Sequence, residues 1–338
     1  MPPLTSRRLA LSIGALLAAF ALSVAVCASL GSSRYTLLDL LRHAADEETA
    51  QAMILRVRLP RILMAALAGA ALGAAGAVFQ ADLRNPLADP YILGVSGGAA
   101  LGAFAATALG LPAIAPVLPV REAAAFLGAI ATVAVLFVLS STRGRVVPYP
   151  MLLIGVIMNT VYLALILLIE TVVESSRLHG VRLWMIGTIP IEEYGLIAAL
   201  SVVLVLSFLG LASYGRDLNL MSAGEEAARS LGVTVERTRV VTVILASLIT
   251  AAVVSVAGPI GFVGLIVPHS ARLMFGPDHR LLVPASALTG AIFLIFADTL
   301  ARTVMAPTEI PVGVVTALCG GPFFLWLYRR QAGGGYFQ

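Results

Sequence analysis

The residues of this sequence that could do covalent chemistry stand at Gly94-Val95-Ser96-Gly97-Gly98. They match the nucleophile pattern G-x-S-x-G and the shorter Gly-x-Ser-Gly of intramembrane serine proteases. The hydrolase pattern needs a strand before the serine, whereas Ser96 stands in an apolar run typical of a membrane helix. A protease would also need a histidine at membrane depth, and His269 is the only candidate. We therefore place proteolysis third among the functions considered and assign Ser96 to close packing, with Asp89-Pro90 starting its helix.

Residues that bind metals or nucleotides are scarce. The four histidines lack the spacing of a zinc site: His43, His179, His269 and His279. All 22 basic residues are arginines, whereas a P-loop needs a lysine to reach the nucleotide phosphates. Cys27 and Cys319 stand in apolar runs and are assigned to packing. We expect this chain to bind no metal and no cofactor of its own.

Acidic residues are missing where an ion-coupled transporter would need them. Such transporters keep carboxylates or broken helices near the membrane midplane. Here Asp298 and Glu170 fall near the outer ends of predicted spans, and Asn159 is the most polar residue at depth. A pathway without charges suits a large substrate whose transport is driven from elsewhere. An ion-coupled secondary transporter remains the main alternative.

Composition indicates the fold class. Hydrophobic residues make up 59% of the sequence and charged residues 12%, more apolar surface than a water-soluble core could hide. A membrane-spanning helix needs about 20 apolar residues, and Gly258-Pro259 breaks the one interval that is too long. We expect an all-α polytopic membrane protein, a single domain at 1–332, with ten spans at about 9–30, 60–81, 91–109, 122–142, 150–170, 194–214, 240–257, 260–275, 281–303 and 310–328.

Arginines predict the orientation. With both ends on one face, 13 arginines lie on that face and 9 on the other, five of them in the loop between the first two spans. Since arginine is enriched in cytoplasmic loops, we expect a multi-pass membrane protein with both termini in the cytoplasm. The first apolar run is too long for a signal peptide. The tail at 333–338 is interpreted as a remnant of cloning.

Small residues at four-residue spacing predict close helix packing in lipid. They occur as Gly69 and Gly73, as Gly94, Gly98 and Gly102, and as Gly313, Ala317 and Gly321. Two outer segments predict short interfacial or re-entrant helices: residues 35–55, where leucines alternate with charges, and residues 181–191, which carry Trp184.

The longest polar interval runs from Arg216 to Arg239. Ser222 and Glu225 have the spacing of a capping box, Glu225 and Arg229 that of an ion pair, and Gly232 is a natural helix stop. The interval therefore predicts one short helix of about nine residues after a turn at 217–221. It could be a connector at the lipid headgroups or a docking element for a soluble partner.

Several blocks of the sequence resemble the permease subunits of metal-chelate ABC importers, the FecCD-type family that carries vitamin B12, haem and ferric siderophores. The resemblance covers about residues 56–330. It rests on RLPR at 58–61, NPLADP at 85–90, ILGVSGGAALGA at 92–103, GEEAARSLGV at 224–233, GPIGFVGLIVPHSAR at 258–272, GPDHR at 276–280 and EIPVGVVTALCGGPFF at 309–324.

The resemblance implies partners and residue roles. Two copies of the permease would form the pathway above two separate ATPase subunits, which bind ATP and magnesium, and beneath a substrate-binding protein; no nucleic acid is implied. Docking to the ATPase would use a cytoplasmic coupling helix within 216–239, with Ser222, Glu225, Glu226, Ala227, Ala228, Arg229, Leu231 and Gly232. Docking of the binding protein would use Arg56, Arg58, Arg61 and Arg302, with membrane snorkelling as the alternative.

The resemblance also implies where the substrate passes. The fifth span, the segment 181–191 and the tenth span would line a cavity at the dimer axis, with Asn159 and Trp184 on the pathway. The cytoplasmic gate would use Asn85, Leu87, Pro148 and Tyr149.

Overall fold

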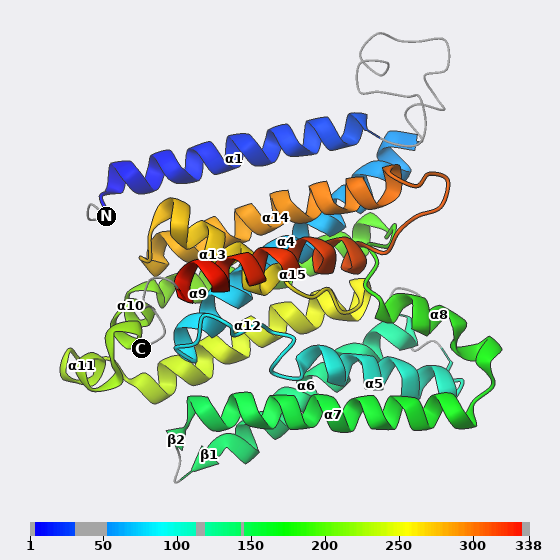
Figure 1. Cartoon of the computed structure of the whole chain (residues 1–338), viewed down its shortest axis with the longest axis horizontal. Helices are drawn as coiled ribbons and strands as arrows, with labels where there is room; N and C mark the ends of the chain where they lie inside the picture. The colour runs from blue at the N-terminus through cyan, green and yellow to red at the C-terminus, as the bar shows by residue number, and fades with distance from the viewer. Residues whose placement is uncertain (1–3, 31–52, 113–118, 143–144, 333–338) are drawn as a thin grey trace.

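The computed structural model describes residues 4–30, 53–112, 119–142 and 145–332, and nearly all of this part is helical (Figure 1). Seven helices are long and apolar enough to cross a membrane: α1 (Ser6–Ser29), η1 with α4 (Ile54–Asp82), α6 (Val120–Ser140), α7 (Pro148–Val172), α9 (Tyr194–Ser213), α12 (Val235–Ala257) and α14 (His279–Thr303). Three more apolar helices are α5 (Val95–Ala108), α13 (Val263–Phe275) and α15 (Val312–Ala332), in which the apolar stretch at Val312–Leu325 is shorter than a span.

Each of the ten predicted spans overlaps one of these apolar helices, so the prediction of a helical multi-span membrane protein is confirmed. Length and composition support seven of them as spans, and the count of ten stays a prediction. The remaining elements are α8 (Ser175–Met185), α10 (Gly215–Ala223), α11 (Glu225–Ser230) and an antiparallel pair of two-residue strands, β1 (Ser141–Thr142) and β2 (Arg145–Val146).

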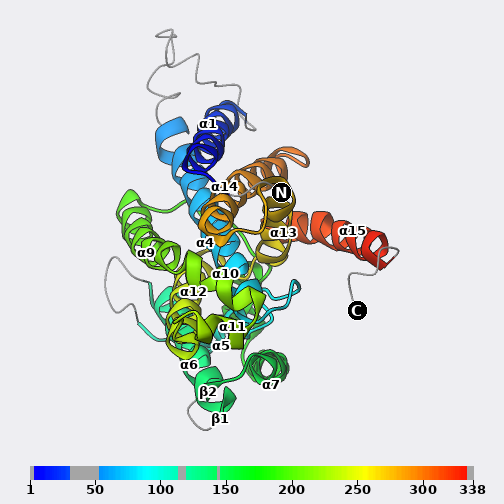
Figure 2. The same cartoon turned by 90° about the vertical axis from the view of Figure 1, so that its left-hand side faces the viewer.

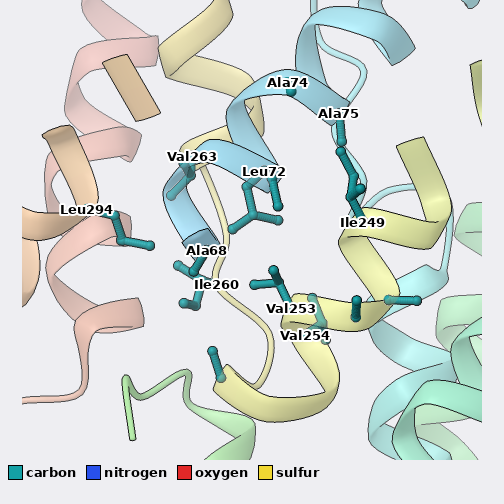
Figure 3. Close-up of a cluster of buried hydrophobic side chains, with 14 of the residues drawn as sticks. Ala68, Leu72, Ala74, Ala75, Ile249, Val253, Val254, Ile260, Val263 and Leu294 are labelled. Carbon is teal, nitrogen blue, oxygen red and sulfur yellow. The ribbon is translucent and has the colours of Figure 1, made fainter. Parts of the chain in front are cut away.

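The centre of the bundle is α4, which packs on α12, α13 and α14. Its side chains meet those of α12, α13 and α14 in the core that Figure 3 shows. A methyl group on Gly69 would overlap the backbone of Gly290, and one on Gly73 the carbonyl oxygen of Ser286. The small residues of α4 therefore bring two helix backbones together, as small residues do in lipid.

A second group of helices, α5, α6 and α7, lies against this centre (Figure 1). Gly98 and Gly102 of α5 face the backbone of α6. A methyl group on Gly102 would overlap the carbonyl oxygen of Ala124. The predicted packing role of this glycine ladder is confirmed.

Helices α1, α7, α9 and α15 lie around the periphery (Figure 2). Large apolar side chains on their outer faces are exposed, among them Leu11 and Leu22 of α1, Leu168 of α7 and Leu206 of α9. Contiguous exposed apolar surface of this kind indicates contact with lipid or with a partner helix.

Two predicted helix starts differ from the structure. Helix α5 begins at Val95, after Gly94 in the left-handed region, so Asp89 caps a turn: its Oδ1 accepts from the Tyr91 amide at 2.7 Å.

Helix α8 is Ser175–Met185, and Gly187, with φ +84°, follows its end. The predicted helix at 181–191 is therefore wrong in its bounds, because the polar residues before Val181 are helical too. Of the predicted helix at 35–55, residues 35–52 lie outside the described residues.

The predicted break at Gly258-Pro259 is confirmed. Helix α12 ends at Ala257, Gly258 has φ +73°, and α13 begins at Val263 after Phe262, whose φ is +69°. A left-handed phenylalanine is unusual, and it stands beside a cavity described below.

Candidate functional site

The polar interval forms two helices, α10 and α11, at one end of the molecule (Figures 1 and 2). The predicted capping box is wrong. Gly224, with φ +142°, caps α11, and the Ser222 hydroxyl donates to the Leu218 carbonyl at 2.8 Å within α10. The glycine interrupts the helix, so Ser222 belongs to the last turn of the preceding one. Gly232, with φ +87°, ends the second helix as predicted.

Glu225 joins α11 to its surroundings. Its carboxylate lies 2.6 Å from the Arg239 guanidinium of α12, 3.5 Å from that of Arg229 and 3.7 Å from that of Arg84. The predicted pair with Arg229 is confirmed, although Arg229 lies closer to Glu236, at 2.7 Å. The sequence does not predict the ion pairs of Glu225 with Arg239 and Arg84, because only the tertiary fold brings residues so far apart in the sequence together.

Arg239 extends this network. Its side chain is 3% exposed and it also donates to the Val146 carbonyl of β2 at 3.0 Å. One turn along α12, the Thr242 hydroxyl donates to the buried Asp82 carboxylate at the end of α4, at 2.6 Å. The network therefore connects α11 with α12, β2 and the segment that follows α4.

The residues of α11 divide into two sides. Ala228 is fully buried and packs with Met221, Val233 and Val235. Glu226, Ala227 and Leu231 are exposed. Ala228 was expected to contact a partner, but its contacts are inside the chain.

The segment between α4 and α5 carries two of the four predicted gate residues, Asn85 and Leu87. Arg84 has φ +47° and the Asn85 Oδ1 accepts from the Leu87 amide at 2.9 Å, so both residues shape a tight turn. Asp89 is buried, and this burial raises its pKa to about 6 although the Tyr91 amide donates to it. Pro148 and Tyr149 begin α7, and the Tyr149 side chain is exposed.

A mostly apolar cavity of about 680 Å³ lies between α5, α7, α13 and α15. Asn159 of α7 lines it and donates to the Tyr91 carbonyl at 2.9 Å. Its lining includes Tyr91, Ile92, Ser96, Gly97, Thr160, Tyr162, Leu163, Met185, Ile186, Phe262, Gly313 and Ala317. The structure thus brings the fifth predicted span, the 181–191 segment and the tenth predicted span to one cavity.

Trp184 stands behind this cavity rather than on its wall. Its side chain is buried, and its indole N–H donates to the Val256 carbonyl at 3.1 Å. The neighbouring Met185 and Ile186 line the cavity in its place.

Three of the outer arginines form hydrogen bonds or ion pairs within the chain. Arg58 is 3% exposed and donates to the Ala28 carbonyl at 2.8 Å, and Arg302 donates to the Cys27 carbonyl at 2.9 Å. Arg61 bridges the buried Asp298 at 3.0 Å and Glu309 at 2.8 Å.

These contacts have a simple cause. The last carbonyls of a helix lack backbone partners and carry partial negative charge, so the end of α1 attracts guanidinium groups. Docking of the binding protein through Arg58, Arg61 and Arg302 stays a prediction, although all three side chains already bind carbonyl or carboxylate groups within the chain. Arg56, in the π-helical turn η1 (Ile54–Arg58), is exposed.

A family model decides the assignment. The model of the FecCD transport family matches residues 15–330, which is nearly the whole chain. The chain belongs to the FecCD transport family. It is a transmembrane permease of the ABC transporter type, as the sequence blocks predict.

Individual relatives agree with this assignment. The chain is 46% identical to the cobalamin import system permease protein BtuC of Halobacterium salinarum, over 84% of this chain and 75% of that protein. It is 39% identical to the hemin transport system permease protein HmuU of Yersinia pestis, over 94% and 96%. A solved structure described as an inward-facing conformation of a metal-chelate type ABC transporter has a TM-score of 0.82 at 30% identity, over 95% of this chain and 99% of that one.

Proposed function

We propose that this permease moves a metal chelate, of the class of haem, ferric siderophores and cobalamin, from an outer binding protein into the cytoplasm. The observation that carries the proposal is the cavity of about 680 Å³, because its wall is mostly apolar and comes from the helices expected to line the pathway. Its polar side chains include Asp89, Ser96, Asn159, Thr160 and Tyr162. A single carboxylate on a mostly apolar wall suits a bulky chelate better than a bare ion, which would need several charged or carbonyl ligands.

In this proposal α11 docks into a partner ATPase, which holds the ATP and magnesium. The support is the exposed side of α11, with Glu226, Ala227 and Leu231, at the end of the bundle. Glu225, on the other side, would pass movement of α11 to Arg239 and to Arg84 in the proposed gate segment.

The remaining partners follow the same scheme. A second copy of the chain would pack near α7, whose exposed apolar face borders the cavity, and close the pathway between two subunits. The substrate-binding protein would dock at the opposite end, near Arg56. The chain would cross a bacterial cytoplasmic membrane ten times with both termini in the cytoplasm.

Reconstitution tests the energy source. The chain, assembled with its ATPase in liposomes, should take up a chelate delivered by the binding protein only when ATP is supplied, and the chain alone should not. Uptake driven by a proton or sodium gradient without nucleotide would support the secondary transporter and contradict the proposal.

A further inference from the structure

A second hollow, separate from the pathway cavity, lies where α1 begins and α4 ends. It is a cleft of about 720 Å³. Three of its lining residues are arginines from three different elements, namely Arg8, Arg84 and Arg272. The others include Leu4, Gln80, Asn85, Asn219, Ser222, Phe275, Asp278 and His279.

The charges of this cleft do not balance within the described part of the chain. Arg272 is partly buried and donates to an amide oxygen, the Gln80 Oε1 at 3.1 Å, and no ion pair of Arg272 is found among the described residues. Arg84 is half-exposed and forms a long ion pair with Glu225 at 3.7 Å, but this carboxylate is shared with Arg239 at 2.6 Å and Arg229 at 3.5 Å. Arg8 donates to the Phe275 carbonyl at 2.9 Å.

Among the described residues of the wall the one carboxylate is that of Asp278, and it is already hydrogen-bonded. It accepts from the Arg280 guanidinium at 2.6 Å and from the Asn219 amide at 2.8 Å, and these bonds lower its pKa to about 2. Arg280 therefore neutralises it. Because no ion pair of Arg272 is found among the described residues and Arg84 shares one carboxylate with two other arginines, an excess of positive charge remains at the wall. A cleft with this excess attracts an anion that offers several oxygens, since guanidinium groups bind phosphate through paired hydrogen bonds.

The position of the cleft indicates the source of that anion. Arg8 lies in the first turn of α1, and Leu4 comes just before this helix. The outer face of α1 exposes Leu11 and Leu22. An acyl chain could lie along that face while its headgroup enters the cleft. Basic pockets between membrane helices on the cytoplasmic side bind anionic lipid headgroups.

We propose that this cleft binds the phosphate-bearing headgroup of an anionic phospholipid in the cytoplasmic leaflet, through Arg84 and Arg272 with Arg8 at its mouth. The proposal rests on the orientation given under the proposed function. Because the cleft joins α10 to the starts of α1 and α14, a bound lipid would hold the coupling region against the bundle.

Lipid retention by the full chain tests this proposal. The wild type and the variants Arg84→Gln, Arg272→Gln and Arg216→Gln are placed in nanodiscs of phosphatidylcholine, with and without phosphatidylglycerol. Bound phosphatidylglycerol is then measured by native mass spectrometry, and folding by circular dichroism. Arg216→Gln is the matched control, because Arg216 is an exposed arginine of α10 that does not line the cleft.

We expect each cleft variant to weaken phosphatidylglycerol binding about fivefold, the ratio that corresponds to about 1 kcal/mol per basic residue, and the control to bind as the wild type does. Arg84→Gln keeps the test valid if Arg272→Gln fails to fold, since Arg84 is half-exposed. Equal binding in all four proteins would overturn the proposal.

Two other outcomes would also overturn it. If inorganic phosphate displaces phosphatidylglycerol fully, the cleft is a site for free anions. If the cleft variants keep the lipid but lose affinity for the ATPase, the occupant is an acidic segment of that partner. Neither result bears on the proposed transport function, which is tested separately by ATP-driven uptake.

Discussion

At the residue scale, Glu225 is the side chain on which the coupling region depends most. Its strongest partner, Arg239, is almost fully buried and would lose its carboxylate in Glu225→Gln. Removing one partner of a buried ion pair leaves an uncompensated charge, and because Glu225 is partly exposed we expect a loss of about 1–2 kcal/mol. Stimulation of the partner ATPase by transport substrate should fall as well.

The neighbouring Glu226→Gln provides the control for stability, since Glu226 is exposed on the same turn of α11. Thermal unfolding of the chain and ATPase activity of the assembled transporter measure the two effects. A Glu225→Gln variant with the stability of Glu226→Gln and the coupling of the wild type would show that the network around Arg239 is only incidental.

At the scale of elements, Asp278 and Asn219 hold α10 against the start of α14. The Asp278 side chain caps α14 through the Arg280 amide, and the Asn219 Oδ1 accepts from the His279 amide at 2.8 Å. The hydrogen bond from the Arg280 side chain is the main reason that the pKa of Asp278 is lowered to about 2.

This shift predicts a pH dependence. The folded-state pKa lies below the ordinary value near 4, so the folded chain binds the proton less readily than the unfolded chain does. The stabilisation is complete above about pH 4 and is lost as the pH falls towards 2. Asp278→Asn keeps a good helix cap and should flatten this part of the profile, which thermal unfolding between those pH values would measure. An unchanged slope would show that another group causes the acid sensitivity.

How far the sequence predicts these elements depends on the range of the forces involved. Apolar length is a local property, so all ten apolar helices and the break at Gly258-Pro259 could be predicted. The division between α10 and α11 could not, because Ser222 and Glu225 fit a capping box while the backbone of Gly224 takes φ +142°.

The contacts of the candidate site likewise divide into those set by local spacing, which can be predicted, and those set by the tertiary fold, which cannot. The pair of Glu225 with Arg229 follows from helical spacing. The ion pair of Glu225 with Arg239 and the hydrogen bond from Arg58 to the Ala28 carbonyl depend on which helices become neighbours. Local sequence patterns do not predict that.

At the scale of the whole molecule, the two ends of the bundle use arginine differently. At the end near α11, arginines line the cleft and pair with Glu225. At the other end, Arg58, Arg61 and Arg302 bind carbonyl and carboxylate groups of α1, α14 and the segment after it, and thereby hold the bundle together.

This division predicts which outer arginine serves a partner. Arg56 is exposed in η1, so Arg56→Glu should weaken docking of the substrate-binding protein. An exposed charge pair contributes roughly 0.2–1 kcal/mol, and the difference from the wild type should shrink at high salt because screening acts over about 8 Å at physiological ionic strength. Arg302→Gln should instead lower the unfolding temperature, since the Cys27 carbonyl would lose its partner and the buried Asp298 would keep only Arg61. Arg216→Glu, at the opposite end, controls for the change in net charge. Binding measured at two salt concentrations decides the matter: if Arg56→Glu docks as tightly as Arg216→Glu at both, the binding protein does not use Arg56.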